Sequence, residues 1–199
     1  MFVPLTASKV ISLEKQFKIL AFAGSLRKGS FNKALVRVAV EVAPQNVSME
    51  VFDLEGIPPF NQDLENTPPQ RVKEFKEKIR DADALMIATP EYNYSVPGVL
   101  KNALDWASRP YTQNVLAGKT VAVMSASTGR FGGARAQYHL RQSFVRLNMH
   151  TVNQPEVMLS SAAENVDANG RLTNEETRTL IKQLIEALVA LINTLNCKP

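Results

Sequence analysis

Five consecutive residues in the middle of the chain carry side chains suited to holding a polar, planar ligand. Glu91–Ser95 supplies a carboxylate, two phenols, a carboxamide and a hydroxyl. The apolar run Ala84–Thr89 before it lacks alternation, which is typical of a strand covered on both faces. Pro90 ends this strand because proline has no N–H for a sheet, and Pro97 suits the first turn of a helix expected over Val99–Ala107. The alternatives for the loop are a planar-ligand site at a strand's carboxyl end and an ordinary turn with solvated tyrosines.

A second loop, rich in glycine and serine, is suited to an anion. Gly24–Ser30 follows an apolar strand expected over Phe17–Ala23 and precedes a helix expected over Phe31–Ala43. Such a junction presents unpaired N–H groups and the positive end of the helix dipole. Arg27 adds a guanidinium that can pair with phosphate oxygens. Further neutral donors come from Ser25, Ser30 and Asn32.

The spacing of this loop fits neither of two nucleotide-binding motifs. Gly24 and Gly29 have the spacing of a P-loop, but Ser30 stands where that motif needs lysine. The G-x-G-x-x-G motif of a dinucleotide-binding loop is also incomplete, because its second glycine is absent here. Two interpretations remain: a phosphomonoester site built from hydroxyls, N–H groups and one arginine, and a plain turn with Ser30 as the helix cap.

A third loop has a similar position. Ser127–Gly133 follows a strand expected over Thr120–Ala126 and precedes a helix expected over Ala134–Leu147. Its three glycines allow either close approach of the backbone to a flat ligand or simple flexibility.

The remaining elements complete an α/β pattern. We expect an edge strand over Val47–Leu54, a helix over Pro69–Arg80, and a weaker strand over His150–Leu159 broken by Pro155. The long connection Glu55–Pro69 either lies over a ligand or wraps the surface. A last helix is expected to have Thr173 as its cap, with Glu176 three residues on.

Five strands separated by helices predict a three-layer, flavodoxin-like α/β fold. Right-handed crossovers give a parallel sheet with helices on both faces, and 2-1-3-4-5 is the economical strand order. The loops after the first, third and fourth strands would then meet at one end of the sheet. We expect a single domain over residues 17–199, preceded by an arm over residues 1–16.

Composition excludes several classes of protein. The 199 residues are 45% hydrophobic and 21% charged, with a formal net charge of +4. This mild basicity favours anionic small molecules, and nucleic acid is not expected because no basic patch is interleaved with aromatics. No stretch approaches the ~18 apolar residues of a membrane span, and residues 1–16 do not resemble a secretory signal, so a cytoplasmic location is expected. The single cysteine, Cys197, cannot form an internal disulfide and is expected in a solvated tail.

Other reactive side chains have ordinary interpretations. His139 and His150 are not spaced as metal ligands and are expected to make polar contacts, so no metal is expected. Glu91 is expected to position backbone rather than to act as a base. Trp106 is expected in the core or at a subunit contact, not stacked on a cofactor.

The sequence resembles the NADPH-dependent FMN reductases, in particular their quinone and chromate reductase branch. The resemblance spans roughly residues 17–155. It rests on the paired stretches GSLRKGSFN (24–32) and PEYNYSVPGVLKNALDW (90–106), with STGRFGGARAQYHLRQ (127–142) similar to the third flavin loop of that branch.

This resemblance implies FMN as cofactor, with NADPH or NADH as cosubstrate. The phosphate would lie on Ser25, Arg27, Ser30, Phe31 and Asn32. The ring would lie beside Pro90, Glu91, Tyr92, Asn93 and Tyr94, with further contacts at Ser127 and Gly129. No protein nucleophile is needed, because the flavin itself accepts and passes on a hydride.

Further expectations concern the reaction and the assembly. Quinone, chromate, azo dye or free flavin could each accept electrons in an open pocket shaped by Tyr94, with ping-pong kinetics. The family usually forms dimers or tetramers, so a homodimer or a pair of dimers is expected, with Pro97–Trp106, Arg135 and Tyr138 as candidate contacts. Two alternatives stay open: an electron-transfer flavodoxin, disfavoured by the basic charge and Arg27, and a phosphate-sensing module without redox chemistry.

Overall fold

The computed structural model describes residues 15–196. The arm expected over residues 1–16 lies almost wholly outside the described residues, and so does Cys197. Within residues 15–196, no helix has the length and apolar character needed to cross a membrane.

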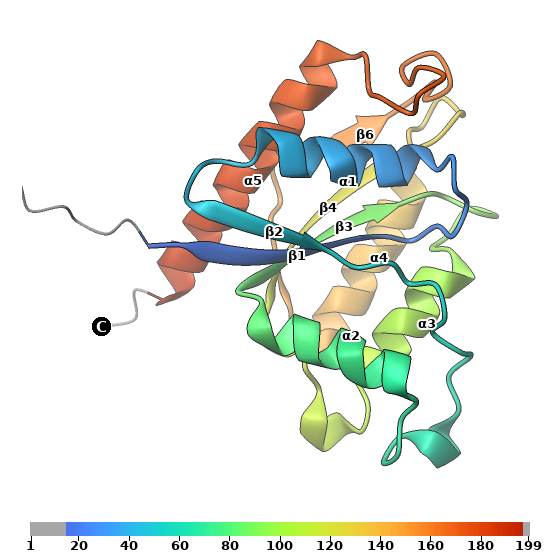
Figure 1. Cartoon of the computed structure of the whole chain (residues 1–199), viewed down its shortest axis with the longest axis vertical. Coiled ribbons are helices and arrows are strands. Elements are labelled where there is room, and N and C mark those ends of the chain that lie inside the picture. The colour runs from blue at the N-terminus through green and yellow to red at the C-terminus, as the bar shows by residue number, and fades with distance from the viewer. Residues whose placement is uncertain (1–14, 197–199) are drawn as a thin grey trace, which may run out of the picture.

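One parallel sheet organises the chain, in the order β2-β1-β3-β4-β5, with β6 also paired to β4 (Figure 1). The strands are β1 (Phe17–Ala23), β2 (Val47–Val51), β3 (Ala84–Thr89), β4 (Thr120–Ala126), β5 (His150–Thr151) and β6 (Val157–Leu159). The predicted order is confirmed. The broken fifth strand consists of two short strands, since β5 pairs with the start of β4 and β6 with its end.

Helices cover both faces of the sheet, which confirms the predicted layers (Figure 1). One face is covered by α1 (Phe31–Val42) and α5 (Glu175–Asn196). The other is covered by α2 (Gln70–Asp81), α3 (Gly98–Ala107) and α4 (Ala134–Leu147). Two short 3₁₀ helices, η1 (Gln62–Leu64) and η2 (Tyr111–Gln113), lie in connections.

The central strands are buried on both faces, as the apolar run without alternation predicted. On β3, Ala84, Met86 and Ala88 pack toward α1 and α5, whereas Leu85 and Ile87 pack toward α2, α3 and α4. The same division holds on β4, where Ala122, Met124 and Ala126 lie on the first face and Val121 and Val123 on the other. Small residues on the first face leave room for α1 and α5 to pack close to the sheet.

The long connection before α2 wraps α3. The carbonyl oxygen of Pro58 accepts hydrogen bonds from Trp106 Nε1 at 2.8 Å and from Asn102 Nδ2 at 2.9 Å. The ring of Phe60 packs edge-on against Trp106, with centroids 5.0 Å apart. Trp106 is 1% exposed, which confirms its core position.

Two predicted boundaries are wrong. The strand expected over Val47–Leu54 ends at Val51, although Phe52 still donates its N–H to Ala21. The last helix begins at Glu175, so its cap is Asn174, whose Oδ1 accepts the Thr177 N–H at 2.8 Å. Thr173 is not the cap, because a cap must directly precede the first helical residue.

Candidate functional site

The first loop turns sharply into α1 and leaves unpaired backbone N–H groups at the N-terminus of this helix. The Ser30 N–H donates to Arg27 O at 3.1 Å, and Ser30 Oγ accepts the Lys33 N–H at 3.4 Å, which confirms Ser30 as the cap. The next two N–H groups, of Phe31 and Asn32, have no acceptor among residues 15–196. They lie at the positive end of α1, where an anion is favoured.

Asn32 ties this helix end to β4. Its Nδ2 donates to Ala126 O at 2.9 Å, and its Oδ1 accepts the Ala126 N–H at 3.0 Å. Asn32 is 2% exposed, so both its Nδ2 and its Oδ1 form their hydrogen bonds inside the protein. The expectation that its side chain supplies a neutral donor to phosphate is therefore wrong, and only its backbone N–H is available.

The second loop is a tight hairpin turn. Tyr92 and Ser95 exchange two backbone hydrogen bonds, at 3.1 and 3.0 Å. Between them, Asn93 and Tyr94 adopt left-handed conformations with φ of 50° and 67°. This geometry is typical of a two-residue turn, and for a residue such as tyrosine it costs about 1–3 kcal/mol. The turn keeps the Tyr94 side chain in solvent, 68% exposed.

Glu91 holds this turn against α4. Its Oε2 accepts the backbone N–H of Arg135 at 3.1 Å, and its Oε1 lies 2.5 Å from both Nε and Nη2 of the Arg135 guanidinium. The carboxylate is thus paired with both the backbone and the side chain of Arg135, as expected of a residue that positions the loop. The same guanidinium lies over Tyr94, with Cζ 3.7 Å from the ring centroid.

Packing against neighbouring residues requires two of the glycines in the third loop. A Cβ on Gly132, at φ 58°, would lie 2.6 Å from Met158 O, and one on Gly133, at φ 90°, would lie 2.7 Å from Ser125 Cβ. Neither glycine is required by a flat ligand, because the protein itself fills the space. Gly129 differs, since its nearest contact would be Ser127 Oγ at 3.6 Å. Only Gly129 therefore leaves the backbone open to a close approach.

These three loops line one pocket at the carboxyl ends of β1, β3 and β4, as predicted. The first loop and α1 contribute Ser25, Arg27, Ser30, Phe31 and Asn32. The second contributes Pro90, Glu91 and Tyr92, and β4 with the third loop contributes Ala126, Ser127 and Thr128.

Some of the predicted site residues do not line this pocket. Asn93, Tyr94 and Gly129 do not line this pocket, the first two because they form the tip of the turn. Ala126 and Thr128 were missed. Their position at the end of β4, on either side of Ser127, is the signal that could have found them.

The pocket suits a phosphate-bearing ligand. The guanidinium of Arg27 is exposed and lies over Phe31, with Cζ 5.0 Å from the ring centroid. Because Arg135 neutralises Glu91, the one carboxylate on the lining does not oppose an anion. Two open N–H groups and a guanidinium are the donors that a phosphate dianion needs, so these residues fit the FMN phosphate.

The histidines contribute nothing reactive to the pocket. His139 Nδ1 lies 3.0 Å from Ser95 Oγ, which is the polar contact expected, and His150 is exposed at the start of β5. Within residues 15–196, no group of three or more His, Cys, Asp or Glu side chains could hold a metal ion.

Comparisons with known proteins agree on one family. The sequence model of the NADPH-dependent FMN reductase family matches residues 17–164. An NAD(P)H-dependent FMN reductase of Pseudomonas aeruginosa is 51% identical over 177 residues, covering 88% of this chain and 95% of that protein. A 2-hydroxy-1,4-benzoquinone reductase of a Burkholderia species is 43% identical over 173 residues, covering 87% and 94%.

A solved structure is also similar. FerB, a flavoenzyme NAD(P)H:acceptor oxidoreductase from Paracoccus denitrificans, superimposes with a TM-score of 0.81 and 35% identity. The match covers 89% of this chain and 98% of that one. The likeness therefore extends over nearly the whole fold.

The phosphate donors can be tested through the difference between FMN and riboflavin. Replacing Arg27 with glutamine should weaken FMN binding by about 1.5–3 kcal/mol, the range for a charge-assisted hydrogen bond. Riboflavin, which lacks the phosphate, should bind the variant as it binds the parent protein. Fluorescence titration of the apoprotein with each ligand measures both affinities.

Lys28→Gln is the matched control, because it removes an exposed charge from the adjacent position. It should weaken FMN far less than Arg27→Gln does. Equal losses for FMN and riboflavin in Arg27→Gln would place Arg27 away from the phosphate.

Proposed function

This chain belongs to the NADPH-dependent FMN reductase family, and we propose that a single pocket beside its FMN admits NAD(P)H and the electron acceptor in turn. The protein is an FMN-dependent NAD(P)H oxidoreductase of the FMN and quinone reductase type. The observation that supports one shared pocket is the convergence of three loops on one hollow at the sheet edge.

In this proposal the protein binds and orients, and its FMN supplies the ring that receives and returns a hydride. The N-terminus of α1 and Arg27 hold the phosphate. The backbone of the second and third loops lies beside the ring, and Ser127 and Thr128 add hydroxyls. Glu91 keeps the second loop in place through Arg135.

The proposed acceptors share one requirement, which is a flat or small molecule that can lie beside the ring. Quinones are supported by relatives such as the Burkholderia 2-hydroxy-1,4-benzoquinone reductase and the Arabidopsis thaliana NADPH:quinone oxidoreductase. Chromate, azo dyes and free flavin are proposed as further acceptors, because a pocket open to solvent selects weakly among them.

Rapid kinetics test this proposal in two halves. In anaerobic stopped flow without acceptor, NADPH or NADH should bleach the visible absorbance of the bound flavin in one turnover. In steady state, varying the quinone at several NAD(P)H concentrations should give parallel double-reciprocal lines. Intersecting lines would show both substrates bound together and would exclude a shared pocket. A flavin that stays oxidised under both nucleotides would favour a flavodoxin-like electron carrier instead.

Tyr94 lies beside the pocket rather than on its lining, and we propose that it shapes the space through which the substrate approaches the ring. Its ring is exposed at the tip of the turn and is held from one side by Arg135. A phenol in this position can stack on a nicotinamide or a quinone and can also hydrogen-bond.

Replacement of Tyr94 with alanine should raise the KM for quinone by roughly 2- to 10-fold, which corresponds to the 0.5–1.5 kcal/mol of an aromatic contact. FMN should remain bound, because its phosphate donors lie on another loop. Tyr94→Phe is the matched variant: a KM near that of the parent enzyme indicates stacking, whereas a loss as large as that of alanine indicates the hydroxyl. Unchanged KM values in Tyr94→Ala would remove this residue from the pocket.

We also propose a homodimer or a pair of dimers, assembled through α4. Tyr138 and Val145 lie seven residues apart on one face of this helix and are 50% and 82% exposed, with Phe131 before the helix 57% exposed. Such an apolar stripe in solvent is typical of an interface. Trp106, predicted within a contact surface, is buried in the core and cannot contribute to one.

Sedimentation velocity tests the assembly against the chain mass of 22.0 kDa. The parent protein should sediment as about two or four chains, and Val145→Glu should shift it toward one chain. Val40→Glu on α1 is the matched control, because Val40 is also exposed, at 42%, but lies on the other face of the sheet. A fully active parent that sediments as one chain at micromolar concentration would contradict the proposal.

A further inference from the structure

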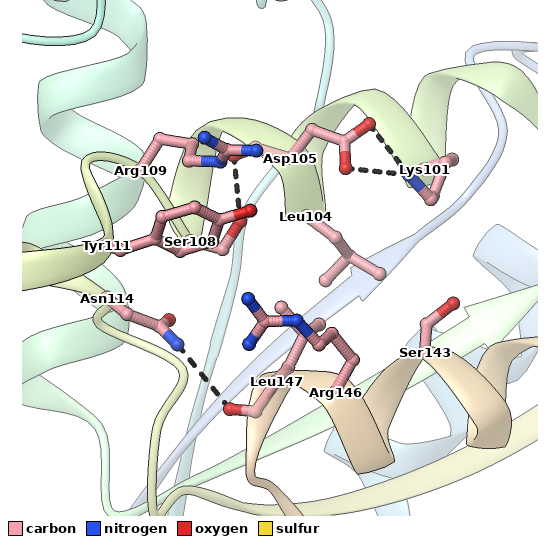
Figure 2. A pocket seen from close by; sticks show the side chains of 10 residues that line it. All are labelled: Lys101, Leu104, Asp105, Ser108, Arg109, Tyr111, Asn114, Ser143, Arg146 and Leu147. Atoms are coloured by element: carbon pink, nitrogen blue, oxygen red, sulfur yellow. Dashed lines mark hydrogen bonds and ion pairs between the residues drawn. The ribbon is translucent and has the colours of Figure 1, made fainter.

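We propose that a groove between the C-terminal ends of α3 and α4 binds a small aromatic anion, such as an aryl carboxylate or sulfonate. The groove lies beside η2 and is lined by side chains from both helices and from the connection between α3 and β4 (Figure 2). It is separate from the flavin loops, because crossover helices run antiparallel to the strands. Their C-termini therefore lie at the opposite edge of the sheet from the carboxyl ends of β1, β3 and β4.

Two arginines from different elements meet at one aromatic ring in this groove. Arg109, just after α3, places its Cζ 3.8 Å from the Tyr111 ring centroid. Arg146, in the last turn of α4, places its Cζ 5.0 Å from the same centroid. Figure 2 shows the Arg146 guanidinium in the middle of the groove, facing Tyr111 and Ser108. Each arginine can stack on the ring while its N–H donors stay available.

The groove carries an excess of positive charge. Lys101 and Asp105 neutralise each other at 2.7 Å. Arg109 forms an ion pair with Glu65 at 3.9 Å, a distance that offsets its charge but is too long for a good hydrogen bond, so its N–H donors stay open to a ligand. Within residues 15–196, no carboxylate lies within 4.0 Å of Arg146.

Helix dipoles explain part of this arrangement but not all of it. A cation at the end of a helix is favoured by the last carbonyls, and this accounts for one arginine at each helix end. It does not account for both arginines lying over Tyr111 at a hollow between the helices. Like charges brought together in this way repel each other, and an anion between them would remove that repulsion.

The other residues that line the groove indicate that the anion has an apolar part. Leu104 is buried and Leu147 is half-buried behind the guanidinium. The neighbouring polar side chains are already engaged, with Ser108 Oγ donating to Asp105 O at 3.0 Å and Asn114 Oδ1 accepting the Leu116 N–H at 3.0 Å. The open partners are therefore guanidinium groups, one phenol and an apolar wall. A flat ring with one anionic group matches this set.

The groove is also distinct from the apolar face of α4 proposed for assembly. Ser143 and Leu147, four residues apart, face the groove, whereas Tyr138 and Val145, seven apart, lie on another face of the helix.

Calorimetric titration of the FMN-loaded protein with 2-naphthoate tests this proposal. We expect saturable binding at one site per chain, with 2-naphthalenemethanol and inorganic phosphate each binding roughly tenfold or more weakly. Arg146→Gln should weaken 2-naphthoate binding by roughly tenfold, the loss expected for a charge-assisted contact. Arg146 is exposed and, within residues 15–196, its side chain makes no hydrogen bond or ion pair and contacts only the Tyr111 ring as a cation–π partner, so this variant should keep its fold, which circular dichroism verifies.

Arg171→Gln is the matched control, since it removes an exposed guanidinium remote from the groove and should not change the affinity. Equal affinity in Arg146→Gln and the parent protein, or a change in the flavin spectrum on binding, would place 2-naphthoate elsewhere and overturn the proposal. Phosphate binding as tight as that of 2-naphthoate would overturn the aromatic requirement. A change in sedimentation caused by Arg146→Gln, without any naphthoate binding to the parent, would make the groove a subunit contact instead.

Discussion

The paired hydrogen bonds between Asn32 and Ala126 are the interaction on which the site most depends. They join residues 94 positions apart, at the start of α1 and at the end of β4. Because α1 begins directly after the first loop, this contact places the N–H groups of the helix end beside the third loop. Each backbone group that Asn32 satisfies is buried, and leaving one of them unpaired would cost about 1–3 kcal/mol.

The second loop is held to the same assembly by a side chain, that of Glu91. Glu91 accepts hydrogen bonds both from the N-terminal backbone of α4 and from the Arg135 side chain, and these contacts join the loop after β3 to the helix after β4. Arg135 then supports the ring of Tyr94 in its left-handed turn. The energy stored in that turn is offset by these contacts, which keep a tyrosine in solvent beside the pocket.

Packing of the sheet separates the residues that stabilise the fold from those that are free to contact ligands. The alanine-rich face of the sheet lets α1 and α5 approach closely, while the leucines, isoleucines and valines of the other face contact α2, α3 and α4. The core is thus complete without any ligand. The loops at the strand ends remain to contact cofactor and substrate. Their exposed residues, such as Tyr94, can change with less effect on the fold than Gly132 or Gly133, which packing requires.

The sequence by itself determined where the strands and helices lie, which strand ends carry chemistry, and that three loops converge. These follow from local patterns: apolar runs, prolines after strands, and glycine or serine before helices. Tertiary structure alone decided what several side chains do. The Asn32 side chain hydrogen-bonds to β4 rather than to a phosphate, and the Glu91 carboxylate pairs with Arg135. Gly132 and Gly133 lack the Cβ atoms that would clash with Met158 and Ser125. Local patterns cannot show these roles, because each depends on a partner from another strand or helix that only the folded sheet brings within contact distance.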